Sequence, residues 1–254
     1  MSHPLAGCRA KITRADKHLK ELNAVGEAWG KNAEYGLTKK PGAKPGTTVW
    51  EVFEEPPIPP EIGIILGDYV HCLRSALDHL VWRLVDLNGQ HVPINRRQDI
   101  YFPVVTTCLA DLWEKPPLRW LTFEQVAFIE GFQPYKVGDA PTPFRDLQFF
   151  WNADKHRVVN PIEVRLSSQG PVFGFGDPTN APKPWFNAAI PLELKAQIAG
   201  YTLTDPDGPD PQVEVKALPV EMFFGERGRP HRDLPTMREF ANDVIEQAAA
   251  RFFV

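Results

Sequence analysis

The chain has 254 residues, of which 43% are hydrophobic and 24% charged, and it contains seven Trp and sixteen Phe. This composition excludes an intrinsically disordered chain, and the length suffices for one large domain or for a domain with a sizeable appendage. The formal net charge of −4 excludes the overall basic excess of a nucleic-acid coat protein, so any contact with nucleic acid has to be local.

The cysteines and the hydropathy pattern indicate the cellular localisation of the protein. The three cysteines are scattered without a Cys-x-x-Cys pair, which argues against a disulfide framework or a Cys-rich zinc site. There is no apolar run of about 18 residues and no hydrophobic signal core at the N-terminus. We therefore expect a cytoplasmic protein without membrane contact.

The first sixty residues predict a long helix followed by a connection. Apolar residues recur at three- and four-residue spacing from Leu5 to Trp29, which is typical of an amphipathic helix over residues 4–33. Repeated Gly and Pro over residues 36–60 then predict a Pro-rich loop, with room for a short strand at 47–53. The basic residues of this region indicate either a solvated helix face or a surface for phosphate groups.

The middle of the chain carries the strongest helix signal. An apolar stripe from Ile62 to Val85 predicts a second helix that ends at Asn88–Gly89. Residues 100–105 form a β-like run that Pro103 confines to an edge or a bend. The sequence Thr122-Phe-Glu-Gln125 matches a capping box and opens a short helix, and a fourth helix is expected over residues 143–158.

The last third changes character and completes the fold prediction. Short β-branched and aromatic runs lie between residues 161 and 225, and a final amphipathic helix covers residues 234–253. The expected fold class is α+β and mainly α: an antiparallel helical bundle with a small β-rich insertion. Residues 1–160 would form the bundle with its Pro-rich loop, residues 161–230 the insertion, and residues 231–254 a C-terminal helix that packs back on the bundle.

The residues with chemical potential lie on two of the predicted helices. On the second helix, Arg74 and Asp78 are one turn apart, whereas His79 points roughly 140° round from Arg74. Asp154 falls within the apolar stripe of the fourth helix, where a carboxylate requires a partner. We hypothesise that Asp154 and the nearby His156 join Arg74, Asp78 and His79 in a buried polar network, which could equally serve only to fix the helix register.

The string Arg74-Ser-Ala-Leu-Asp-His79 resembles the Arg–polar–x3–His motif of the HEPN superfamily of helical-bundle proteins. Many members are metal-independent ribonucleases of toxin–antitoxin or antiviral defence systems, and others are inactive binding modules. The resemblance implies a homodimer whose motifs meet in a cleft, with Arg74 steadying the phosphate and His79 acting as acid and base on the ribose 2′-hydroxyl and the leaving oxygen. It also implies an RNA target and a protein partner such as an antitoxin.

A wider pattern is similar to a group of bacterial proteins of unassigned function, and this similarity implies no reaction. The pattern comprises Gly67-Asp68, the segment from Leu73 to Leu80, Phe102-Pro103, and the segment from Asn152 to Arg157.

Two other functional classes stay open. A metal enzyme would use His and Asp side chains of the helices, although no Glu-x-x-His or His-x3-His pair occurs there and His71 lies two turns from His79. A non-catalytic partner-binding or dimerising protein would use the abundant Trp and Phe, the Pro-rich loop and the β insertion. Because Walker, GxGxxG and Gly-x-Ser-x-Gly motifs are missing, the sequence does not indicate a nucleotide-dependent enzyme or a common hydrolase. Outside the metal-enzyme alternative, we expect no cofactor and no bound metal.

Overall fold

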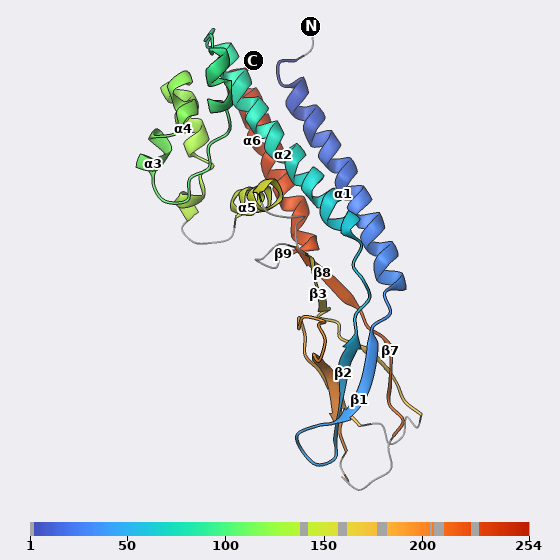
Figure 1. The fold of residues 1–254 in the computed structure, drawn as a ribbon. Coiled ribbons are helices and arrows are strands. Elements are labelled where there is room, and N and C mark those ends of the chain that lie inside the picture. The colour runs from blue at the N-terminus through green and yellow to red at the C-terminus, as the bar shows by residue number, and fades with distance from the viewer. Residues whose placement is uncertain are drawn as a thin grey trace. The chain divides into compact units, whose positions relative to one another are not determined.

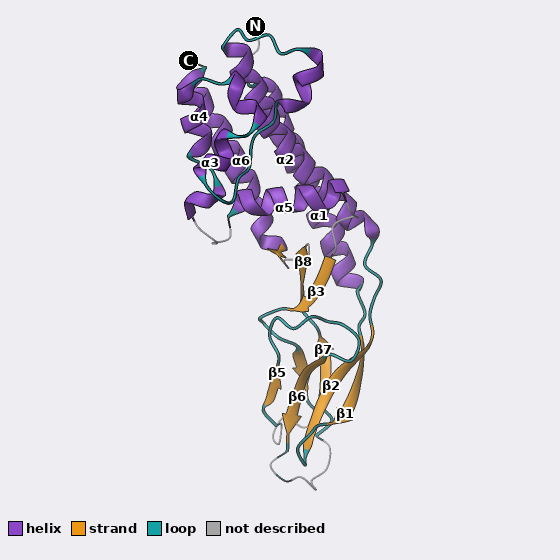
Figure 2. Ribbon diagram, turned by 60° about the vertical axis from the view of Figure 1, so that its left-hand side comes forward, coloured by secondary structure: helices purple, strands orange, loops and turns teal. Residues whose placement is uncertain are grey.

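The computed structural model describes residues 3–137, 142–156, 162–176, 182–203, 205, 211–224 and 229–253. These residues form an α+β protein with two compact units. The first unit is helical and combines Met1–Val25, Pro60–Asn160 and Arg232–Val254, and the second is rich in strands and combines Gly26–Pro59 with Pro161–His231. Figure 1 traces the chain through both units, and Figure 2 distinguishes their helices from their strands.

The helices lie close to where the apolar periodicity predicts them. The first unit holds most of α1 (Ala6–Asn32), then α2 (Pro60–Leu87), α3 (Leu109–Trp113), α4 (Phe123–Glu130), α5 (Pro143–His156) and α6 (Leu234–Phe252). Short 3-10 helices cover Ile94–Asp99, Pro116–Trp120, Pro134–Val137 and His231–Asp233. Within the described residues, no helix is both long and apolar enough to cross a membrane.

Helix α2 is the central element of the helical unit. Every residue of its predicted apolar stripe is buried, and the helix packs against α5 and α6 (Figure 1). The buried hydroxyl of Tyr69 donates a hydrogen bond of 2.6 Å to the carbonyl of Leu234, which fixes the first turn of α6 on α2. Helix α2 ends before Gly89, whose φ of 64° lies in the left-handed region that favours glycine.

The predicted capping box is confirmed at the start of α4. The N–H of Gln125 donates to the hydroxyl of Thr122 at 3.3 Å, and the N–H of Thr122 donates to the side-chain oxygen of Gln125 at 3.0 Å. The amide of Gln125 also pairs with that of Asn88, which joins the start of α4 to the end of α2. One local motif therefore caps one helix and attaches it to another.

The second unit consists of antiparallel strands around its own core. A four-stranded sheet has the order β1-β2-β6-β5, a three-stranded sheet has the order β3-β8-β9, and β4 pairs with β7. The strands are β1 (Gly36–Pro41), β2 (Thr47–Glu54), β3 (Ile162–Leu166), β4 (Val172–Gly174), β5 (Pro184–Phe186), β6 (Gln197–Thr202), β7 (Glu214–Ala217), β8 (Val220–Phe224) and β9 (Arg229–Pro230). Trp50, Val52, Ile198 and Tyr201 belong to the core that they share.

Residues 36–60 do not form the expected Pro-rich loop. They contain the β1–β2 hairpin, whose turn places Gly46 at a φ of 69°, and the run of prolines follows only after β2. The predicted strand at 47–53 is confirmed, but the predicted domain division is corrected, because β2 pairs with β6 and puts Trp50 opposite Ala199. Burial of the large apolar side chains of β2 favours this long-range pairing over a solvated connection.

Strand β6 has no counterpart among the predicted elements. Its four central residues, Ile198, Ala199, Gly200 and Tyr201, are all buried. Ala and Gly are weak strand formers, which hid this strand from propensity arguments. A Cβ at Gly200 would lie 2.5 Å from the ring of Trp185 and 2.6 Å from the carbonyl oxygen of Thr48, so the sheet requires a glycine there.

We predict that Gly200→Ala lowers the free energy of unfolding by about 1–3 kcal/mol, because its methyl group would force the sheet and the indole apart. Gly30→Ala is the control, since a Cβ at this helical glycine meets nothing within 4 Å and should be neutral or stabilising. Chemical denaturation of both variants measures the difference. Equal stabilities would contradict the close packing at Gly200.

Candidate functional site

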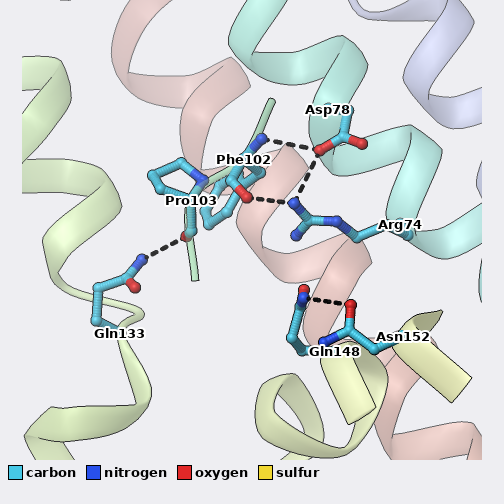
Figure 3. A network of polar contacts seen from close by, with 7 residues as sticks. All are labelled: Arg74, Asp78, Phe102, Pro103, Gln133, Gln148 and Asn152. Carbon is cyan, nitrogen blue, oxygen red and sulfur yellow. Dashed lines mark hydrogen bonds and ion pairs between the residues drawn. The ribbon is translucent and has the colours of Figure 1, made fainter. Parts of the chain in front are cut away.

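Arg74 and Asp78 together bind the backbone of one residue, Phe102. The Phe102 N–H donates to Asp78 Oδ1 at 2.8 Å, and Arg74 Nη2 donates to the Phe102 carbonyl. The two side chains also form an ion pair, with Arg74 Nη2 3.2 Å from Asp78 Oδ1. Figure 3 shows both side chains reaching from α2 to this peptide segment. The pair thus supplies the donor and the acceptor that a neighbouring strand would otherwise offer.

A buried glutamine binds the same segment from its other side. Gln133, which is 2% exposed, donates from Nε2 to the carbonyl of Pro103 at 3.0 Å. Its Oε1 accepts the N–H of Val105 at 2.8 Å. We call Arg74, Asp78 and Gln133 the backbone clamp. The predicted β-like run at 100–105 is therefore extended chain held by side chains rather than a strand in a sheet.

Burial governs the electrostatics of the clamp. Arg74 is only 5% exposed, and burial lowers the pKa of its guanidinium, an effect that the charge of Asp78 opposes. Burial raises the pKa of Asp78, whereas Arg74 and the Phe102 N–H oppose this rise. Arginine nevertheless stays protonated in proteins, so the clamp contains a permanent buried cation beside its carboxylate. Nη1 of Arg74 and Oε1 of Gln148 are buried without a hydrogen-bond partner among the described residues.

His79 lies apart from Arg74, in agreement with the helical-wheel prediction. Its side chain is exposed, whereas that of Arg74 is buried. The pKa of His79 is lowered first by partial burial and then by the charges of Lys11 and Arg83, which Asp78 opposes. A lowered pKa favours the neutral imidazole of His79, which is the form that can accept a proton.

Asp154 does approach α2, but at a different place from the one expected. It lies over Gly67, where a Cβ would come within 2.3 Å of Asp154 Oδ1. Its pKa is raised by burial and by the charge of Asp68, and His71 opposes this rise. The aromatic ring of His71 in turn packs against Trp151, with ring centroids 5.2 Å apart.

The predicted single polar network is therefore divided. In the described part of the chain, the ion-pair and hydrogen-bond partners of the Arg74 guanidinium are Asp78 and Phe102, not Asp154. His156 is in the last turn of α5, but its side chain lies outside the described part of the structure. Asp154 instead belongs with Gly67, Asp68 and His71, and Gly67 is the residue that lets the two helices come close enough.

Sequence reasoning also missed two features that the structure brings forward. No local signal marks Gln133 as a ligand of the backbone at 103–105. Trp113 and Phe123 stack at a centroid distance of 6.2 Å and an interplanar angle of 20°, yet they are 47% and 77% exposed. Exposed apolar side chains that lie together are a feature of interaction surfaces.

Comparisons and a search for metal sites add no further assignment. Comparison of the chain with protein-family models, curated proteins and solved structures finds no match. Across the described ranges, no group of three or more His, Cys, Asp and Glu side chains could hold a metal ion.

We predict that Arg74→Ala lowers the free energy of unfolding by about 3 kcal/mol or more, because Asp78 loses its counter-charge and the Phe102 carbonyl loses its donor. Arg83→Ala is the matched control on the same helix, since Arg83 forms an ion pair of 3.0 Å with Asp86 and both side chains are about half exposed. That variant should cost less than about 1 kcal/mol. Similar losses for both variants in urea denaturation would refute a structural role for the clamp.

We predict that the pKa of His79 lies below the ordinary value of histidine and that Lys11→Gln raises it toward that value, because a nearby positive charge is removed. The pKa of His79 in the wild type and in the variant is measured from the NMR signals of the histidine rings between about pH 5 and pH 8, the range in which histidine titrates. His231 serves as the internal control, because burial lowers its pKa against the opposing charges of Glu221 and Glu27 and Lys11 has no part in that shift. An unchanged His79 titration in the variant would exclude Lys11 as a cause.

Proposed function

We propose that this chain is a non-catalytic, dimerising protein whose helical unit is an HEPN-like bundle used for binding. The observation that carries the proposal is the exposed aromatic patch, defined as Leu109, Trp113 and Phe123. Leu109 and Trp113 are one turn apart on α3, and Trp113 stacks on Phe123 at the start of α4. All three side chains are at least 40% exposed.

The patch is not needed for the local core. Leu112 and Val126, on the same two helices, are buried and pack in a small cluster with Val105 and Leu118. Because this cluster already covers the inner faces of α3 and α4, the aromatic patch on their outer faces is available to a partner. Burial of large aromatic side chains is also the usual energetic centre of a protein interface.

A second copy of the chain is the partner that we propose. The patch contains no charged side chain, so it requires no partner of opposite charge. A two-fold contact would place the same apolar surface on both sides, which is the commonest arrangement of soluble oligomers. The HEPN-like resemblance of residues 74–79 independently implies a homodimer.

The backbone clamp supports a binding role over catalysis by Arg74. A phosphate would have to reach a guanidinium that is 5% exposed and already bonded to Asp78 and Phe102. Moving Arg74 toward RNA would leave the partly buried Asp78 carboxylate without its counter-charge and the Phe102 carbonyl without its donor. In this proposal, the Arg–x4–His motif stabilises the bundle.

RNA binding or metal-independent RNA cleavage is the second candidate, and His79 favours it. This histidine is exposed and feels the charges of Lys11 and Arg83. In this alternative, His79 would exchange protons with the ribose 2′-hydroxyl, while Lys11 and Arg83 would contact the phosphate in place of Arg74.

Sedimentation of the full chain tests the first proposal. We expect a dimer for the wild type, and a monomer of unchanged fold for the double variant Trp113→Ser/Phe123→Ser, because polar side chains remove the apolar contact. Ile94→Ser, at an 80% exposed isoleucine outside the patch, should remain dimeric. A wild-type protein that is monomeric at a concentration of about tens of micromolar, at which weak homodimers form, would contradict the proposal.

RNA cleavage in EDTA separates the two candidates. The first proposal expects a folded wild-type protein that leaves a single-stranded RNA intact. Cleavage that His79→Ala abolishes and His91→Ala preserves would instead establish the ribonuclease candidate.

A further inference from the structure

A cleft of about 640 Å³ lies in the β-rich unit, and its lining shares no residue with the backbone clamp or the aromatic patch. Tyr35 and three segments border it: the Pro-rich segment after β2, the first residues of β3, and residues 191–193. Val164 and Leu192 contribute to its lining and are only 5% and 4% exposed, so the cleft rests on the core of the unit. Its volume is within the usual range of ligand sites.

Hydrogen bonds hold the borders of this cleft in place. The Leu192 N–H donates to the Val164 carbonyl at 2.8 Å, which fixes residues 191–193 on β3. The indole N–H of Trp29 donates to the Pro57 carbonyl at 3.0 Å, which fixes the Pro-rich border. A cleft with restrained walls loses little entropy when a ligand binds.

The charged side chains that line the cleft are all acidic. Three glutamates line it, and none of the described residues that line it is Lys, Arg or His. Glu163 is occupied, because Arg165 binds both of its carboxylate oxygens at 2.7 and 3.0 Å. Glu55 accepts the Leu194 N–H at 2.6 Å through one oxygen. The carboxylate of exposed Glu193 has no ion pair or hydrogen bond to any described residue.

The negative charge of Glu55 acts on a second side chain of the cleft, the hydroxyl of Tyr35. Tyr35 lines the cleft, and its pKa is raised to about 12, first by burial and then by the charge of Glu55. Its hydroxyl therefore stays protonated and available as a hydrogen-bond donor. The remaining border is apolar and carries Pro56, Ile58 and Pro191.

We propose that this cleft binds an extended peptide segment of another protein, in which a Lys or Arg lies next to bulky apolar residues. The cation would meet Glu193 and the free oxygen of Glu55, and the apolar side chains would cover Ile58 and Pro191. A small polyamine would match the charge but would leave the apolar border uncovered. This inference does not depend on the dimer contact of the helical unit.

NMR titration of the ¹⁵N-labelled full chain tests the peptide site. The probe is a mixture of capped tetrapeptides that each contain one lysine among leucine, phenylalanine and proline. The Leu194 N–H and the Trp29 indole N–H are the reporters, because each is hydrogen-bonded to a cleft residue. We expect both signals to shift in a saturable manner, and we expect the same peptides with acetylated lysine to bind more weakly.

Variants assign the charge contact. Glu193→Gln should weaken peptide binding by about three-fold, in keeping with the loss of one exposed ion pair, and Glu193→Lys should weaken it further. Glu54→Gln is the matched control, since this exposed glutamate does not line the cleft. Unchanged melting temperatures would show that these exposed substitutions leave the fold intact.

Three outcomes would overturn the peptide proposal. The first is that neither reporter signal responds to the lysine peptides. The second is that acetylated peptides, or peptides with glutamate in place of lysine, bind as tightly. The third is that spermidine reproduces both shifts with the affinity of the peptides, because the apolar side chains would then contribute nothing.

Discussion

The helical unit depends on satisfying the peptide groups of residues 102–105 without a neighbouring strand. A buried N–H or carbonyl without a partner costs about 1–3 kcal/mol, and Phe102 is fully buried within this segment. Arg74 and Asp78 take the place of one neighbouring strand, and Gln133 takes the place of another. Three side chains thereby connect the region after α2 to α2 itself and to the chain that follows α4.

This constraint gives Arg74, the first residue of the Arg74–His79 motif, a structural role. This residue is enclosed by the backbone that it supports, whereas the last residue of the motif faces solvent. The two ends of this short motif therefore lie in different environments. Arg74 is buried and holds the backbone of Phe102, whereas His79 is exposed. Any RNA chemistry would have to begin from His79 and its basic neighbours on α1 and α2.

Most of the helices could be predicted from local patterns in the sequence. The stripe of α2 and the capping box of α4 could be predicted because spacing within one segment determines them. The i,i+4 pair of Arg74 and Asp78 was visible for the same reason. The contact of this pair with Phe102 could not be predicted, because a hydrogen bond between an α2 side chain and a distant peptide group produces no repeating pattern in the sequence.

The errors arose where tertiary packing decides the outcome. Asp154 was expected beside Arg74 or His79, but the missing side chain at Gly67 makes room for it elsewhere on α2. Strand β6 was missed because close approach to Trp185 requires a glycine, and glycine counts against a strand in any propensity scale. In both cases, an absent side chain positions a neighbouring one.

The pairing of β2 with β6 also constrains how the protein is made. Trp50 leaves the ribosome long before Ala199, its partner in the sheet, has been synthesised. The nascent chain must therefore keep an apolar hairpin unpaired while the whole of the following helical segment emerges. Contacts of such high sequence separation form slowly, so the apolar side chains of this hairpin stay exposed in the nascent chain until β6 has been made.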